Sequence, residues 1–328
     1  RWLTTEEISQ SDKGKQMNAL GFHIPGRFDK ILDINYCYLQ PAPSNEIRLA
    51  ARAYALIHQI PFYDLRTHEG FMRSIIIRNT GLGHLMVIVT VAGDDSSVTI
   101  PFLEHLHITF PEITSIYYAV NKKVNDYLYD LDMIHFYGDH YITEQIDSIQ
   151  YRLGPKSFFQ TNPEQAKNLY HIALGFAELN KEDIVYDFYT GLGSIALLAA
   201  HHCKKVIGVE NVDASIADAN MNAQFNNISN CTFIYGDILK VFTDTFIEEH
   251  GKADVVITDP PRAGMHKDVC IQLLKLEPEK IVYVSCNPVT QARDIQILSE
   301  KYEVVKLQPV DMFPHTYHVE NVALLKRK

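Results

Sequence analysis

The sequence predicts an α/β protein in which a doubly wound sheet of mostly parallel strands follows a smaller α+β domain. From residue 151 to 328, short apolar runs alternate with helical stretches. The runs are continuously apolar, as in strands buried on both faces, and strand–helix alternation is typical of a parallel sheet covered on both sides. The last two runs, 304–312 and 321–326, have no helical stretch between them. We therefore expect them to close the sheet as a hairpin that adds one antiparallel strand.

The first domain, residues 1–150, has shorter and more mixed segments. Its amphipathic stretch at 44–59 predicts a helix, and an Asn-Thr-Gly turn at 79–81 separates two strand-like segments. The predicted strands of this domain are 73–78, 85–91, 113–120 and 133–137.

The second domain, residues 151–328, alternates strands and helices in chain order. The predicted strands before the closing hairpin are 183–188, 205–210, 231–235, 254–258 and 280–285. The predicted helices are 194–202, 212–226, 267–276 and 288–300. In open sheets of this kind ligands bind at the carboxyl ends of the strands, so each motif can be judged by where it falls.

Composition places the chain among ordinary globular proteins. Of its 328 residues 46% are hydrophobic and 21% charged, and no uncharged apolar run approaches the roughly 20 residues that span a bilayer. Its five cysteines are scattered, which favours a reducing compartment, and we expect a cytoplasmic protein. A net charge of −10 counts against a basic protein that binds nucleic acid over its whole surface, although a local basic groove could still bind RNA.

Three strand ends predict a nucleotide site. Residues 187–193 read Asp-Phe-Tyr-Thr-Gly-Leu-Gly, a loop in which Gly191 lets the backbone approach a ligand. Glu210 ends the next strand, where a carboxylate can accept hydrogen bonds from ribose hydroxyls, and Asp237 ends the third, where it can meet an adenine amino group. Position 196 is Ala196, so the full dinucleotide fingerprint is absent. The pattern favours an adenosyl cofactor, S-adenosylmethionine above all, over the alternative of ordinary turns and a helix cap.

The next strand ends carry reactive side chains. Residues 259–262 read Asp-Pro-Pro-Arg, and Cys286 follows the strand 280–285. A thiolate that adds to C6 of uracil turns the poorly nucleophilic C5 into an enolate-like carbon, and a base must later remove the C5 proton. Glu320, at the mouth of the final hairpin, can be that base. The alternatives are a structural turn, a buried core thiol and a surface acid.

Six motifs in this order resemble the RNA (uracil-5-)-methyltransferase family, whose members modify tRNA and ribosomal RNA. Besides the four strand-end motifs, residues 157–162 resemble a Phe-x-Gln-x-Asn segment, and 318–321 resemble the motif that carries the base. The resemblance implies a Rossmann-like, class I S-adenosylmethionine-dependent methyltransferase fold over 151–328. It also implies that the smaller domain takes part in RNA recognition.

The resemblance also assigns roles to residues. Cys286 would be the nucleophile and Glu320 the proton acceptor. The implied cofactor-binding residues are Gln160, Tyr189, Gly191, Glu210, Asp237 and Asp259. The implied substrate-binding residues are Phe158 and Arg262, with Phe158 near a uridine that has left its stack. The implied partner is structured RNA, tRNA or ribosomal RNA, with no membrane and no obligate protein partner.

The chain also departs from the family pattern. The usual Asp-Leu-Phe-Cys-Gly loop here has Tyr189 and Thr190, and an N-terminal β-barrel RNA-binding domain is not seen in this sequence. Several members hold a [4Fe–4S] cluster on four cysteines, and Cys37 resembles the fourth. Three partner cysteines are absent here, so we expect a cluster only if a segment preceding Arg1 supplies them, and we expect no other metal.

Three rival functions remain at this stage. Cytosine-C5 methylation uses similar chemistry, but those RNA enzymes pair a Pro-Cys after the fourth strand with a second Cys, and here Pro261 precedes Arg262. Methylation of an exocyclic amine would need Asp259 but not Cys286. A non-catalytic RNA-binding fragment would need neither Cys286 nor Glu320. The joint presence of these residues favours uracil-C5 methylation.

Overall fold

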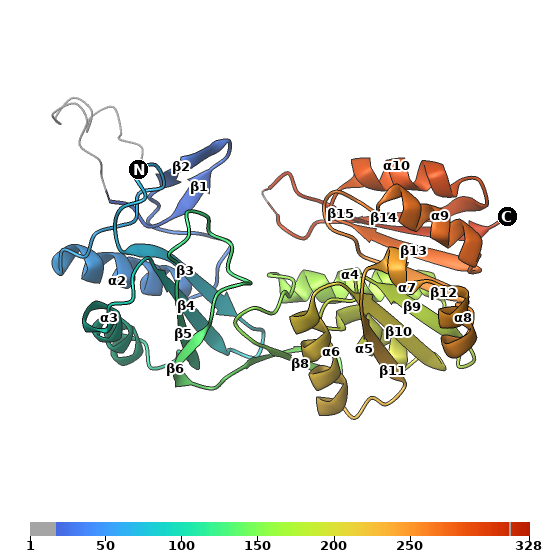
Figure 1. The fold of residues 1–328 in the computed structure, drawn as a ribbon, viewed down its shortest axis with the longest axis horizontal. Helices are drawn as coiled ribbons and strands as arrows, with labels where there is room; N and C mark the ends of the chain where they lie inside the picture. Colours follow the sequence, from blue (N-terminus) through green and yellow to red (C-terminus); the bar gives the residue numbers. More distant parts are fainter. Residues whose placement is uncertain (1–17, 315) are drawn as a thin grey trace. The chain divides into compact units, whose positions relative to one another are not determined.

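The computed structural model describes residues 18–314 and 316–328. Two compact units divide between Ile142 and Thr143. The chain runs from the first unit, blue to green in Figure 1, into the second, green to red.

The first unit contains a four-stranded sheet with two helices on one of its faces, and a separate antiparallel pair formed by the first two strands. The sheet order is β3-β4-β5-β6, with β4 and β5 parallel and the outer pairs antiparallel. Alternate residues of β4 from Leu85 to Val91 pack with residues of both helices, so the two helices share that face. The strands are β1 (Phe22–Ile24), β2 (Arg27–Leu32), β3 (Met72–Asn79), β4 (Leu85–Val91), β5 (Ser115–Val120) and β6 (Ile134–Gly138). The helices are α2 (Ser44–Ile57) and α3 (Ser96–Thr109).

The second unit is built on a seven-stranded sheet of order β11-β10-β9-β12-β13-β15-β14. The first five strands are parallel, and β15 is antiparallel to both β13 and β14. The predicted doubly wound sheet, closed by a hairpin with one antiparallel strand, is therefore confirmed, and that strand, β15, lies inside the edge strand β14. The strands are β9 (Ile184–Phe188), β10 (Lys205–Glu210), β11 (Cys231–Tyr235), β12 (Val255–Thr258), β13 (Lys280–Ser285), β14 (Tyr302–Val310) and β15 (Glu320–Arg327).

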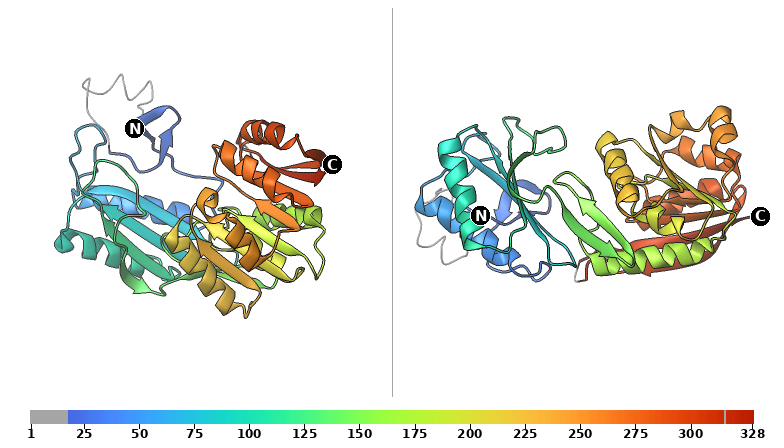
Figure 2. Two further views of the ribbon diagram at one scale, coloured as in Figure 1. Left: turned by 45° about the vertical axis from the view of Figure 1, so that its right-hand side comes forward. Right: turned by 90° about the horizontal axis from the view of Figure 1, so that it is seen from below.

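Helices cover both faces of this sheet. Tyr186, Ile207 and Val256 point into a core shared with α7 to α10, whereas Gly208, on the opposite face of β10, lies under α5. Helix α4 packs on β12 to β15, and α5 and α6 pack on β9 to β11. Figure 2 shows α4 on the other side of the sheet from α9 and α10. The helices are α4 (Pro163–Ala177), α5 (Ser194–Ala200), α6 (Asp213–Phe225), α7 (Ile238–Val241), α8 (Asp244–His250), α9 (Lys267–Leu276) and α10 (Pro288–Leu298).

A hairpin that the sequence did not predict opens the second unit. Strands β7 (Ile142–Ile146) and β8 (Ile149–Leu153) pair with each other, and β8 packs on α5 and α6. The side-chain amides of Asn222 and Asn226 accept from the backbone N–H groups of Arg152 and Gln150, at 2.8 and 2.9 Å. Two asparagines one helical turn apart thus satisfy the free edge of a strand. Residues 143–150, assigned from sequence to the first domain, consequently pack in the second unit.

Gly208 offers a test of how tightly this face of the sheet is packed. A Cβ at this position would lie 2.6 Å from Cδ1 of Phe233 and 2.8 Å from Oγ1 of Thr190. We expect Gly208→Ala to lower the free energy of unfolding by about 1–3 kcal/mol through overpacking, measured by urea unfolding followed by circular dichroism. Gly175→Ala is the control, because nothing lies within 4 Å of its Cβ position in α4. Equal unfolding midpoints for Gly208→Ala and the wild type would contradict this packing.

Candidate active site

The topology gathers the predicted site residues at one edge of the sheet. Parallel strands β9 to β13 all end there, and antiparallel β15 begins there. The strand register shows that these strand ends lie at a similar height in the sheet, because Thr258 at the end of β12 pairs with both Phe188 of β9 and Tyr283 of β13. The motifs that follow these strands therefore lie around the carboxyl edge, where ligands bind in such sheets.

The loop after β9 is shaped by three residues in the left-handed region. Tyr189, Gly191 and Gly193 have φ of 62°, 56° and 86°. A Cβ on Gly191 would meet nothing within 4 Å, so open space lies above this glycine. Below it, the hydroxyl of Thr190 donates to the buried carboxyl of Asp187 at 2.6 Å. The loop thus has a rigid base and an exposed backbone that a ligand could approach.

Glu210 connects this loop to the end of β10. Its Oε2 accepts from the N–H of Gly191 at 3.1 Å, and its Oε1 accepts from the N–H groups of Asn211 and Val212 at 2.8 and 3.1 Å. The carboxylate is half-buried. Because a carboxylate has about four lone-pair positions, these three bonds fix its orientation and leave capacity for a further donor such as a ribose hydroxyl.

The other predicted cofactor residues lie at neighbouring loops. Asp237 is exposed and caps α7 by accepting from the N–H of Leu239 at 2.9 Å. Gln160 is half-buried in a segment that is tied down on both sides. Before it, the hydroxyl of Ser157 bonds Asp218 of α6 at 2.5 Å. After it, the amide of Asn162 donates to the carbonyl of Met312 at 2.9 Å.

Cys286 and Glu320 lie at the same end of the antiparallel pair of β13 and β15. The last registered pair is Ser285 with Asn321, so Cys286 directly follows this pair on one strand and Glu320 directly precedes it on the other. The carboxyl of Glu320 is close enough to act electrostatically on the Cys286 thiol. The thiol is half-buried and the Glu320 carboxyl is buried, with 7% of the residue exposed.

Burial dominates the electrostatics of this edge. It raises the pKa of Glu320 to about 7. Burial, followed by repulsion from Glu320 and Asp187, raises the pKa of Asp259 to about 8. Burial, followed by repulsion from the carboxyls of Glu320 and Asp259, raises the pKa of the Cys286 thiol, whereas Arg262 lowers it. The side chains of Cys286, Asp259, Arg262 and Glu320 therefore lie close enough together to interact electrostatically.

The two predicted substrate-binding residues are exposed. Phe158 is 65% exposed, in the same segment as Gln160. Arg262 is exposed on the loop that follows Asp259, while its backbone carbonyl accepts two hydrogen bonds from side chains of the α10 region.

Cys37 lies in the first unit, not at this edge. It is half-buried, and its backbone N–H and carbonyl bond the side chain of Asn45 at 2.7 and 3.1 Å. Within residues 18–314 and 316–328, no group of three or more histidine, cysteine or acidic side chains is arranged to hold a metal ion.

A network of buried polar side chains on α10 was missed by sequence reasoning. Gln291 donates to the carbonyls of Tyr283 and Asn321 at 2.8 and 3.2 Å, and the Asn321 amide donates back to it at 2.6 Å. Asp294, fully buried, accepts from the hydroxyl of Tyr283 at 2.7 Å. The available signal was the placement of these polar residues three apart on the helix, on the side that also carries the buried Leu298.

Comparison with known proteins gives consistent similarities. The family model described as tRNA (Uracil-5-)-methyltransferase matches residues 132–328. An uncharacterized RNA methyltransferase of Bacteroides thetaiotaomicron is 51% identical, over 99% of this chain and 72% of that protein. Another, of Porphyromonas gingivalis, is 48% identical over 100% of this chain and 72% of that protein.

Solved structures are similar in the same way. The tRNA (uracil-54, C5)-methyltransferase of Pyrococcus abyssi, solved in complex with S-adenosyl-L-homocysteine, has a TM-score of 0.77 and 31% identity. The match covers 93% of this chain and 72% of that one. A putative S-adenosylmethionine-dependent methyltransferase from Streptococcus mutans, at TM-score 0.52 and 14% identity, covers 88% of this chain and 83% of that one and shares the fold. Among the described residues, no helix combines the length and apolar character needed to cross a membrane.

The raised pKa of Asp259 predicts a pH-dependent stability. Its pKa is about 8 when folded and about 3.9 when unfolded, so the folded state holds the proton more strongly. This contribution to stability is fully present below about pH 4 and is lost as the pH rises through about 8. Between pH 5.5 and 8.5 we expect the free energy of unfolding to fall by about 3 kcal/mol less in Asp259→Asn than in the wild type.

Urea unfolding at the two pH values measures this difference. Glu303→Gln, which removes an exposed carboxyl on β14, should retain the wild-type pH dependence. The burial argument is contradicted if Asp259→Asn loses as much stability with rising pH as the wild type does.

Proposed function

Because the chain belongs to the tRNA (uracil-5-)-methyltransferase family, we propose that it methylates C5 of a uridine in RNA with S-adenosylmethionine as methyl donor. The resemblance inferred from six sequence motifs is thereby confirmed, as is the class I S-adenosylmethionine-dependent methyltransferase fold. The observation that supports the proposal is that Cys286, next to the end of β13, and the buried carboxyl of Glu320, at the start of antiparallel β15, lie at the same end of this strand pair.

The first step is addition of the Cys286 thiolate to C6 of the uracil. The new Sγ–C6 bond breaks the C5=C6 double bond and moves its electron pair to C5, which becomes an enolate-like nucleophile. A base within a duplex cannot reach the thiol, so the target uridine must leave its stack. Phe158, with its ring largely exposed, would stack on the extruded base, and the exposed Arg262 would contact the RNA.

The cofactor would lie along the loops after β9, β10 and β11. S-adenosylmethionine, when bound, supplies the methyl group that C5 acquires. The open space above Gly191 and the oriented carboxylate of Glu210 fit the adenosyl group, with Asp237 placed for the adenine amino group. The remaining proposed contacts are Gln160, Tyr189 and Asp259.

The second step is removal of the C5 proton by Glu320. The proton passes to its carboxylate, the C5–H electron pair restores the C5=C6 double bond, and the C6–Sγ bond breaks to release the thiolate. A pKa near 7 makes this carboxylate a stronger base than an exposed glutamate, while about half of it remains ionised at neutral pH. The proton acceptor and the nucleophile are therefore positioned by the same pair of strands.

The rival functions would not require both Cys286 and Glu320. Amine methylation has no use for a thiol beside a buried acid, and a non-catalytic RNA-binding fragment would need neither residue.

We propose that the substrate is structured tRNA or ribosomal RNA, in line with the tRNA substrate in the name of the Pyrococcus enzyme. Five free cysteines fit a cytoplasmic enzyme, and the mechanism makes no use of Cys37 or an iron–sulfur cluster.

Trapping with fluorinated RNA tests the proposed chemistry. Fluorine at C5 cannot leave as a proton, so transfer RNA or ribosomal RNA transcripts made with 5-fluorouridine should form a lasting bond to Cys286 when S-adenosylmethionine is present. We expect a denaturant-stable complex with the wild type and none with Cys286→Ala. Cys231→Ala, which removes another half-buried thiol of the same unit, should still form it. An adduct that persists in Cys286→Ala, or its absence from a wild type that binds RNA and cofactor, would refute the mechanism.

With ordinary uridine the same assay separates the two steps. Glu320→Gln should reduce turnover by a factor of about 10²–10⁴, because the general base is lost, and should accumulate the methylated adduct on Cys286. Mass spectrometry of the cross-linked peptide identifies it. Full turnover by Glu320→Gln would assign the base to another residue.

The cofactor site predicts a binding defect. Glu210→Gln keeps the shape of the side chain but replaces charge-assisted hydrogen bonds with neutral ones, so we expect the Kd for S-adenosylmethionine to rise about tenfold or more in calorimetric titrations. The exposed-site variant Glu303→Gln should bind like the wild type. An unchanged Kd in Glu210→Gln would place the ribose elsewhere.

A further inference from the structure

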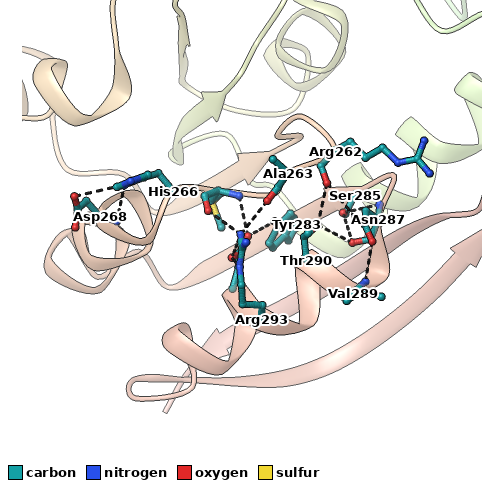
Figure 3. A network of polar contacts seen from close by, with 12 residues as sticks. Arg262, Ala263, His266, Asp268, Tyr283, Ser285, Asn287, Val289, Thr290 and Arg293 are labelled. Atoms are coloured by element: carbon teal, nitrogen blue, oxygen red, sulfur yellow. Dashed lines mark hydrogen bonds and ion pairs between the residues drawn. The ribbon is translucent and has the colours of Figure 1, made fainter. Parts of the chain in front are cut away.

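The loop that carries Arg262 is hydrogen-bonded to the start of α10 (Figure 3). The carbonyl of Arg262 accepts from Nδ2 of Asn287 at 3.1 Å and from the hydroxyl of Thr290 at 3.3 Å. The same hydroxyl lies 3.0 Å from the carbonyl of Asn287. Since Asn287 directly follows Cys286, these bonds join the nucleophile's loop to the loop after Asp259.

A second set of bonds holds the rest of the same loop. The guanidinium of Arg293 donates to the carbonyls of Ala263 and Met265 at 3.0 and 3.1 Å. The Asp294 carboxyl accepts from the N–H of Met265 at 2.8 Å and pairs with Arg293 at 2.7 Å. We call Asn287, Thr290, Arg293 and Asp294 the α10 clamp.

Gly264 shows how closely the clamp encloses the loop. Its φ is +79°, and a Cβ there would lie 2.6 Å from Oδ2 of Asp294 and 2.7 Å from Nη2 of Arg293. Every backbone carbonyl or N–H named above is thus held by a side chain of the clamp. Such fixation exceeds what an exposed connection between a strand and a helix needs, since loops of this kind are usually mobile.

The backbone that the clamp fixes carries Arg262, whose carbonyl is hydrogen-bonded to the residue directly after Cys286. Two acids also influence this thiol, Glu320 at the start of β15 and Asp259 on the same loop as Arg262. Among these charged neighbours in the part of the chain that the structure describes, Arg262 is the cation. A cation beside a thiol favours the reactive thiolate, and the effect depends on distance.

We propose that Thr290, acting with the rest of the α10 clamp, is a positioning residue that holds the Arg262 guanidinium beside Cys286 and so makes this thiol a better nucleophile. This inference rests on the proposed role of Cys286 and extends it to the residues that hold its cationic neighbour. The clamp acts through the backbone of the loop that carries Arg262.

Alkylation of the RNA-free protein by iodoacetamide tests this proposal. The reagent is uncharged and reacts with thiolate, so its rate at Cys286, measured by peptide mass spectrometry from pH 6.5 to 9.5, reports the thiolate fraction. We expect Thr290→Val, of equal size but without the hydroxyl, to react about threefold more slowly at pH 7.5, with its pH midpoint shifted upward. Thr290→Ser should react like the wild type, as should Val289→Ala, which changes an exposed side chain of the same turn.

A double-mutant cycle shows whether Thr290 acts through Arg262. Arg262→Gln should slow alkylation at least as much as Thr290→Val, and the double variant should be no slower than Arg262→Gln alone. Additive effects, or a wild-type rate in Thr290→Val, would overturn the proposal. Thr290→Ala replaces Thr290→Val if circular dichroism shows that the valine variant is misfolded. Because no RNA is used, this result is independent of whether the fluorinated RNA forms an adduct.

Discussion

Strand β15 runs antiparallel between β13 and β14, and its pairing with β13 brings Glu320, from near the end of the chain, close to Cys286. Residues Val322 to Leu325 of β15 are fully buried, so the strand is apolar on both faces. A run of this kind specifies its register weakly, because a slip by one residue exchanges one apolar side chain for another. The hydrogen bonds between Gln291 and Asn321 supply the missing specification, since only one register brings that asparagine within reach. The proximity of Cys286 and Glu320 thus depends on the buried amide of Gln291 and its partly buried partner Asn321.

Burial at the same edge explains why the site contains acids that hold protons. Asp187, Asp259 and Glu320 all have pKa values raised primarily by burial, to about 7, 8 and 7. Ionisation of one raises the cost of ionising its neighbours, so the edge accommodates few negative charges at a time. A carboxylate in this setting is a stronger base than an exposed one, which suits removal of a carbon-bound proton. The same burial raises the pKa of the Cys286 thiol, and the positive charge of Arg262 opposes that effect.

Most of the second unit was predictable because its signals are local. Continuous apolar runs marked β9 to β13, and the residues just after each run were correctly expected at one edge. The order of the last two strands is not a local property, and the sequence indicated only that they form a hairpin. The β7–β8 hairpin was missed because β8 is satisfied by Asn222 and Asn226, which lie far along the chain. The polar residues of α10 were missed because a buried, bonded Asp294 and a solvated one look identical in a sequence.

Net charge alone is a poor guide to how this chain meets RNA. The formal value of −10 counts every carboxyl as ionised. At pH 7 an acid with a pKa of about 8 is mostly neutral, and two acids with pKa values near 7 are about half neutral, so the catalytic edge carries roughly two fewer negative charges than the formula assigns. Those charges are removed where a phosphate backbone would have to approach, and the exposed guanidinium of Arg262 lies at the same place. Within a Debye length of about 8 Å, it is this local balance that an RNA strand senses. Burial of Asp187, Asp259 and Glu320 therefore lowers the negative charge at the edge where we propose that RNA binds.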